Sequence, residues 1–141
     1  MLNKFLDFII LSLVFSASLL AASFPQRIAS GTVGTDENLL KLLKGEEQRI
    51  VALSTFADNS KYSFVTEIPK SVKARVGDNI ESLLVVNPDL VILASYSAPE
   101  IAQQLKSAKV NVQIQKSFGG IKDIEDNIVE LGRLIGKEKE A

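Results

Sequence analysis

The stretch from Val76 to Ser95, VGDNIESLLVVNPDLVILAS, decides the fold class. Asp78 and Glu81 have the D-x-x-E spacing of a capping box, in which each side chain accepts a hydrogen bond from the other residue's backbone N–H at the start of a helix. Apolar residues follow at i, i+3 and i+4 within 80–84, which places them on one helix face. The stretch is therefore predicted to begin with a capped amphipathic helix.

A buried strand is expected to follow this helix. The Asn87-Pro88 pair ends the helix, because proline disfavours α geometry in the residue before it. Leu90 to Ala94 is apolar without alternation, as expected of a strand that is covered on both faces within a parallel sheet. A helix followed by such a strand is typical of α/β folds.

The remaining segments alternate strands and helices in the same way. The last strand alternates polar and apolar residues, which suggests one wetter face near an edge of the sheet. The segment from Thr55 to Val76 is expected to be a polar connection. The expected strands are Arg27–Ser30, Arg49–Ser54, Asp89–Ser95 and Val110–Gln115.

Three further helix signals complete the pattern. Thr35 is expected to cap a helix whose first turn carries Asp36, where an acidic residue suits the helix dipole, and Gly45 is expected to end it. Ser97-Ala98-Pro99-Glu100 is a second capping box. A final helix carries an apolar stripe of Ile121, Ile124, Ile128, Leu131 and Ile135. We therefore expect an α/β fold, a single three-layer lobe with a mostly parallel sheet of four to five strands flanked by helices.

Composition excludes several function classes. The 141 residues carry 16 Lys and Arg against 17 Asp and Glu, and this balance argues against a nucleic-acid binder, which needs a clustered basic face. The sequence contains no Cys and no His, which removes a thiolate nucleophile and the commonest general base and metal ligand. Because mechanisms that depend on Cys or His are excluded, we expect no enzymatic activity and no resident cofactor or metal.

The first 23 residues are predicted to be a cleavable export signal. Lys4 gives a weakly basic start, Phe8 to Leu20 forms an apolar core, and Ala21-Ala22-Ser23 supplies small residues for cleavage. An uncleaved membrane anchor is the alternative, although the apolar run is shorter than the roughly 20 residues that a spanning helix needs. Cleavage would leave one small exported domain.

Candidate ligand contacts lie in the loops that follow the strands, because parallel α/β sheets bind ligands beyond the carboxyl ends of their strands. Four aromatic residues in or near these loops suit stacking on a flat or apolar ligand, with ordinary packing as the alternative. An acidic residue could polarise a ligand, with a solvated turn as the alternative, and an arginine could pair with the carboxylate or phosphate of a ligand, with an ordinary surface position as the alternative. The predicted ligand-binding residues are Phe56, Asp58, Tyr62, Arg75, Tyr96 and Phe118.

The chain resembles the periplasmic substrate-binding proteins of ABC importers, in the class that carries iron–siderophores, haem and cobalamin. The resemblance is carried by Gly77, Asn79-Ile80-Glu81 and Pro88-Asp89-Leu90-Val91, where the family has a glycine, N-[LI]-E and P-D-L-[VI]. The order of the flanking elements extends it over Arg27 to Ala141. It implies a periplasmic protein with two α/β lobes and a ligand in the cleft between them.

The same resemblance implies partners for particular residues. A glutamate that docks onto the inner-membrane permease, which works with an ATPase, falls on Glu81, although a capping role would explain this residue equally well. Ligand contacts fall near Phe56, and Arg75 suits an anionic metal chelate such as a siderophore or haem more than a corrin.

The resemblance also divides the chain. It implies a signal peptide over 1–23, an N-terminal substrate-binding lobe over 24–136 and the start of an inter-lobe helix over 137–141, with the second lobe absent. A truncated or split gene product, or a second lobe on another polypeptide, would account for this. Two rival functions stay open: a stand-alone interaction domain that has lost transport, and a small α/β enzyme.

Overall fold

The computed structural model describes residues 24–77, 80–97, 99–116 and 119–141. The expected signal peptide over 1–23, Asp78 of the first capping box, Ala98 of the second and the ligand candidate Phe118 lie outside these ranges. Within the described ranges, no helix is long and apolar enough to cross a membrane.

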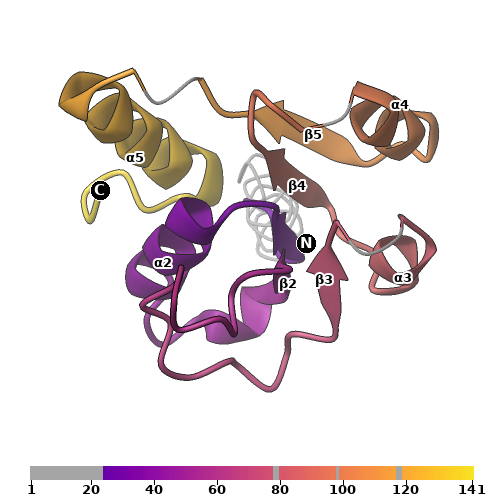
Figure 1. Cartoon of the computed structure of the whole chain (residues 1–141), viewed down its shortest axis with the longest axis horizontal. Coiled ribbons are helices and arrows are strands. Elements are labelled where there is room, and N and C mark those ends of the chain that lie inside the picture. Colours follow the sequence, from indigo (N-terminus) through magenta and orange to yellow (C-terminus); the bar gives the residue numbers. More distant parts are fainter. Residues whose placement is uncertain (1–23, 78–79, 98, 117–118) are drawn as a thin grey trace, which may run out of the picture.

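The described chain forms a parallel sheet of five strands in the order β3-β2-β1-β4-β5 (Figure 1). Four strands fall within the predicted segments, and this confirms the predicted α/β class. The prediction that the whole of 55–76 is a polar connection was wrong, because its last three residues pair with β2. The strands are β1 (Ile28–Ser30), β2 (Ile50–Ser54), β3 (Ala74–Val76), β4 (Leu90–Leu93) and β5 (Asn111–Ile114).

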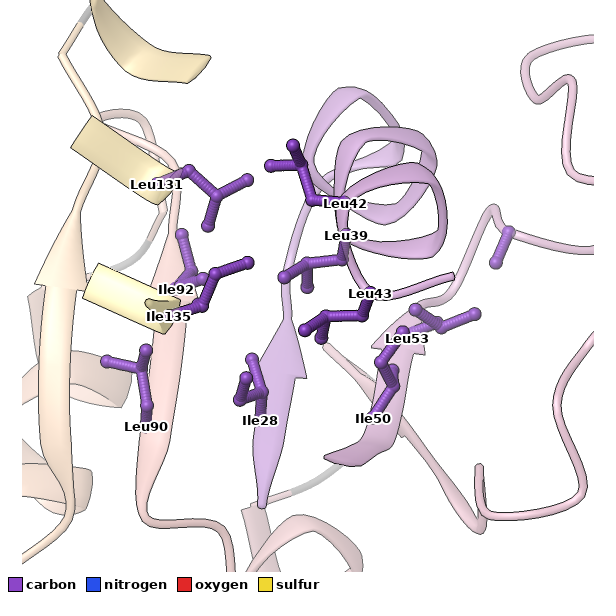
Figure 2. Packing of buried hydrophobic residues seen from close by; sticks show 11 residues of the cluster. Ile28, Leu39, Leu42, Leu43, Ile50, Leu53, Leu90, Ile92, Leu131 and Ile135 are labelled. Carbon is purple, nitrogen blue, oxygen red and sulfur yellow. The ribbon is translucent and has the colours of Figure 1, made fainter. Parts of the chain in front are cut away.

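Helices cover both faces of the sheet and make three layers. On one face, α2 (Val33–Leu42) and α5 (Ile121–Ile135) pack over a core that includes Ile28, Leu53 and Ile92 (Figure 2). On the other face, α3 (Ile80–Val85) and α4 (Pro99–Ser107) pack over a second apolar cluster. All four residues of β4 are buried, as the unbroken apolar run of that strand predicts.

The start of α2 differs from the prediction. Thr32, rather than Thr35, is the N-cap, and its Oγ1 accepts a hydrogen bond from the Thr35 backbone N–H at 3.2 Å. Gly34 therefore lies inside the helix. The C-cap is Leu43, and Gly45 lies two residues further on, with a φ of 86° in the turn that leads to a short 3₁₀ helix, η1 (Glu47–Arg49).

The helix within the opening stretch behaves as its sequence predicts. Leu83 is buried and packs with the second cluster. The helix ends at Val85, and Asn87 before the proline takes a left-handed conformation with a φ of 46°. The carboxylate of Asp89 then accepts hydrogen bonds from the backbone N–H groups of Gln26, at 2.7 Å, and Arg27, at 3.0 Å. The Pro-Asp pair thus joins the start of β4 to the start of β1.

The strand β5 lies at the edge of the sheet, as predicted, and each of its two faces is partly covered. Gln113 donates to Glu130 on α5 at 3.0 Å, and Gln115 is buried. On the opposite face Ile114 is 41% exposed but Val112 packs against the second apolar cluster, and Asn111 on the polar face is exposed. Helix α5 covers part of the polar face through Gln113, so alternation describes the exposure of this strand only in part.

The apolar stripe of α5 is buried only toward its C-terminal end. Leu131 and Ile135 enter the core, whereas Ile121 is 77% exposed and Ile124 is 44% exposed. Gly136 ends the helix in a left-handed conformation, and residues 138–140 form a turn; the start of an inter-lobe helix over 137–141 stays a prediction. The backbone N–H of Lys137 donates to Gly132 at 2.6 Å, which folds these residues back against α5.

Candidate functional site

Strands β1 to β3 extend the sheet in one direction, and β4 and β5 extend it in the other, so the order of strands reverses between the neighbours β1 and β4. The chain leaves β1 for α2 on one face and leaves β4 for α4 on the other, and in α/β sheets ligands commonly bind at such a point, beyond the edge where the strands end. We call this edge the carboxyl edge. Gly31 directly follows β1 at this edge, and its N–H donates to the Ile92 carbonyl oxygen at 2.8 Å. A Cβ at position 31 would lie 3.1 Å from that oxygen, so the close approach favours glycine.

Residues 55–62, which we call the aromatic loop, rise from the end of β2 at the carboxyl edge. Ala57 is fully buried and anchors the loop, with its N–H bonded to the Ser54 carbonyl oxygen at 3.1 Å. The rings of Phe56 and Tyr62 meet edge-to-face with centroids 5.7 Å apart, and the two side chains are 53% and 55% exposed. Lys61 places its Nζ 5.3 Å from the centre of the Tyr62 ring. The loop therefore presents a preformed pair of aromatic rings to solvent.

Arg75 and Asp58, both predicted ligand contacts, pair with each other beside this loop. The Arg75 Nη2 and Nε donate to the Asp58 Oδ2 at 2.6 and 3.2 Å. The Asp58 side chain is 57% exposed and that of Arg75 is 23% exposed. Ion pairs this open to water contribute little to stability, so an anionic ligand could compete with Asp58 for the guanidinium.

Tyr96 lies apart from the aromatic loop along the same edge. It is 77% exposed, in a turn after β4 where the Ser97 N–H bonds to the Ala94 carbonyl oxygen at 3.0 Å. One strand, β1, separates β4 from β2, so the two strand ends are roughly 10 Å apart. The structure thus brings Phe56, Asp58, Tyr62 and Arg75 together and places Tyr96 two strands away along the carboxyl edge.

A buried polar layer lies beneath the carboxyl edge, and no sequence motif predicted it directly. Asp36 in the first turn of α2 has no exposed surface. Its carboxylate accepts the Ser54 N–H at 3.1 and 3.2 Å and the Ser54 hydroxyl at 2.5 Å. Burial raises the pKa of Asp36 from 3.8 to about 6, and hydrogen bonds from Ser30 and Ser54 and the charge of Arg75 limit the rise.

The same layer reaches the far strand of the sheet. The Thr35 hydroxyl donates to the side-chain oxygen of Gln115, just beyond β5, at 2.7 Å. Thr32 Oγ1 lies 2.8 Å from Thr35 Oγ1, and the Ser30 hydroxyl, within reach of Asp36, also lies 3.2 Å from the Thr32 carbonyl oxygen. The first turn of α2 is thereby fastened to the ends of β1, β2 and β5. The sequence contains one indirect sign of this layer. Both β1 and β2 end in serine, and the helix between them carries Asp36 in its first turn.

Glu81 lies on the surface at the start of α3. The inward face of that helix is fixed by Leu83, so the position of Glu81 is set by the packing of α3 on the sheet. Its proposed capping partner lies outside the described residues, and the capping role stays a prediction.

Two other features bear on ligand chemistry. No group of three or more acidic side chains in the described part of the chain could hold a metal ion. A groove of about 740 Å³ runs between α2 and the extended segment after the aromatic loop, and its lining includes Glu37, Lys41 and Phe64. None of the five predicted ligand contacts that the structure describes lines this groove, so it is separate from the carboxyl edge.

Comparisons with known proteins agree with this architecture. The profile of a family described as periplasmic binding protein matches residues 28–141. No curated protein shows significant similarity. A possible iron-binding (periplasmic solute-binding) protein from Staphylococcus epidermidis is 27% identical, with a TM-score of 0.66 over 84% of this chain and 45% of that chain.

Two further solved structures share the fold. A periplasmic haem-binding protein from Pseudomonas aeruginosa is 23% identical, with a TM-score of 0.65 over 82% of this chain and 40% of that chain. A periplasmic vitamin B12-binding protein from Vibrio cholerae is 21% identical, with a TM-score of 0.61 over 82% of this chain and 44% of that chain. This chain thus spans less than half the length of the three solved structures.

Proposed function

Because the chain belongs to the periplasmic binding protein family, we propose that it is the N-terminal lobe of the solute-binding component of an ABC importer. In this proposal the lobe is exported to the periplasm and its carboxyl edge forms one wall of a binding cleft. The ligand is a metal chelate such as an iron–siderophore, haem or a cobalamin-like compound. Structures described as binding haem and vitamin B12 share its fold, which supports this ligand class.

The observation that carries the proposal is the exposed ring pair of Phe56 and Tyr62 at the carboxyl edge. Exposed aromatic rings that are already packed against each other lose little conformational freedom when a ligand covers them. A flat or apolar chelate surface would bury both rings. Arg75 lies beside them and could exchange Asp58 for a carboxylate of the ligand.

The ligand class is tested by titrating the purified protein with haemin, a ferric siderophore and cobalamin, followed by absorbance and by tyrosine fluorescence. Tyrosine emission is usable because the sequence contains two Tyr and no Trp. Saturable binding of at least one compound is expected. Flat titrations with all three, for this chain and for the chain joined to a second lobe, would contradict the uptake function.

Truncating the ring pair should weaken ligand binding. Phe56→Ala and Tyr62→Ala are each expected to lower affinity by about 2- to 10-fold, the size of an aromatic contact. Phe64→Ala is the matched control, because Phe64 is 89% exposed but lines the separate groove. The measurement is the dissociation constant of whichever chelate binds. If Phe64→Ala lowered ligand affinity as much as the ring-pair variants do, the aromatic loop would not be part of the binding site.

Glu81 is proposed to dock onto the permease. Both Glu81→Ala and Glu81→Gln should lower affinity for the permease by about tenfold or more, because an arginine on the permease would lose its charged partner. Co-sedimentation with permease in proteoliposomes measures this. Glu81→Gln retains a side chain able to cap, so its free energy of unfolding should match that of the wild type. If Glu81→Gln bound the permease with unchanged affinity, the role of Glu81 would be structural only.

A further inference from the structure

Asp36 is an ionisable group in a place where ionisation is costly. Its carboxyl group has no exposed surface and lies in the first turn of α2, between the ends of β1 and β2. An acid held at a cost in stability beneath a candidate binding surface is a pattern found at functional sites, although it also occurs in structural networks. The position of Asp36 relative to the aromatic loop favours a functional role.

The carboxylate holds the residue from which the aromatic loop departs. Ser54 is the last residue of β2, and both its N–H and its hydroxyl donate to Asp36. The Ser54 carbonyl oxygen in turn accepts the N–H of Ala57, the buried anchor of the loop. Phe56 lies between these two residues, so a change at Ser54 reaches the ring pair through one turn of backbone.

We propose that Asp36 is a proton-responsive positioning residue that holds the aromatic loop in its binding geometry when it is ionised and loosens it when it is neutral. The inference rests on the proposed ligand-binding role of that loop. An ionised carboxylate accepts every donor that surrounds it, whereas a neutral one carries its own O–H, which must compete with the hydroxyls of Ser54 and Ser30. Acidification should therefore release the loop and the ligand together.

The charges around Asp36 allow this transition to be isolated. Arg75 on β3 is the charged side chain that acts on it, and Arg75 is itself paired with Asp58. Ser30 on β1 and Ser54 on β2 contact it without titrating in this range. The chain contains no histidine, so no other side chain has an ordinary pKa near 6. A transition near pH 6 in the loop would identify Asp36, whose pKa is about 6.

The test places a fluorescent reporter in the loop and needs no ligand. Tyr62→Trp keeps a ring against Phe56 and supplies a tryptophan in a sequence that has none. Any histidine tag must be removed, because it would titrate in the same range. Emission should change with a midpoint near pH 6, while far-UV circular dichroism stays constant. Since the reporter is read without ligand, failed ligand binding would sink the proposed function and leave this result standing.

Two variants assign the transition. In Asp36→Asn, which cannot ionise, the midpoint should disappear. In Ser54→Ala, Asp36 loses a hydrogen bond that lowers its pKa, so the midpoint should move to higher pH. Ser54→Ala still carries the titrating acid, and it decides the matter if Asp36→Asn fails to fold. A reporter that shows no midpoint, or one that stays in place in both variants, would overturn the proposal.

Discussion

Replacing Arg49 by Met should lower the free energy of unfolding by about 3 kcal/mol. Arg49 is 6% exposed and donates from Nε and Nη2 to the Pro25 carbonyl oxygen at 3.0 and 2.7 Å. Nη2 also reaches the Ile135 carbonyl oxygen at 2.8 Å, and Nη1 pairs with Glu46 at 2.7 Å. Arg49 thus joins the segment before β1 to the end of α5, and methionine would leave both carbonyl groups without this donor.

The matched control is Arg133→Met, which also removes an arginine and an ion pair. The Arg133 side chain is 64% exposed and pairs with Glu138 at 2.8 Å. Because water replaces such a contact, the expected loss is below about 0.5 kcal/mol. Urea denaturation followed by circular dichroism at neutral pH measures both variants. Similar small losses for the two arginines would show that Arg49 does not tie these segments together.

The sequence predicts most of this fold because its buried strands are continuous apolar runs. Residues such as Ile92 and Leu53 need no knowledge of their partners to be assigned to a core, since their neighbours along the chain are also apolar. The helix at 80–85 was equally clear, because its stripe and the Asn87-Pro88 stop agree. These features are local, and local patterns suffice for them.

The elements that the sequence missed depend on distant partners. Ala74 to Val76 becomes a strand only because it pairs with β2, for example Ala52 with Ala74, and three residues carry too little pattern to reveal this. By its position in the sequence, Asp36 cannot be told from an exposed acidic residue in the first turn of a helix. Its burial follows from the convergence of Ser30 and Ser54 at the ends of two strands, which no helix pattern contains.

The candidate site was predicted in part. Placing ligand contacts after the strands brought Phe56, Tyr62 and Tyr96 to the carboxyl edge, because strand ends in a parallel sheet share one side. The pairing of Arg75 with Asp58 depends on side chains 17 residues apart and was beyond the reach of spacing arguments. The Asp89 of the family phrase joins β1 to β4, so part of that phrase serves the fold rather than the ligand.

The stability of the protein should also depend on pH through Asp36, in a direction opposite to that of exposed acids. Burial raises the folded-state pKa of Asp36 from 3.8 to about 6. Its stabilising contribution is fully present below about pH 3.8 and is lost as the pH rises through about 6, because the folded state holds the proton more tightly than the unfolded state. The full difference is about 3 kcal/mol, of which about 2 kcal/mol falls between about pH 4.5 and 7.

Asp36→Asn isolates this effect, because it removes the titration and keeps a side chain of the same shape. The wild type should lose about 2 kcal/mol relative to Asp36→Asn between about pH 4.5 and 7, measured as free energies of unfolding in urea. Pairing with cations lowers the pKa of exposed acids such as Glu46 and Asp126, so they lose stability as the pH falls, and the comparison cancels their shared contribution. A constant difference across this range would mean that the folded protein does not hold a proton on Asp36. Any transition seen with the fluorescent reporter would then come from a group other than Asp36. The pH dependence of stability therefore tests the positioning role of Asp36 before any ligand is known.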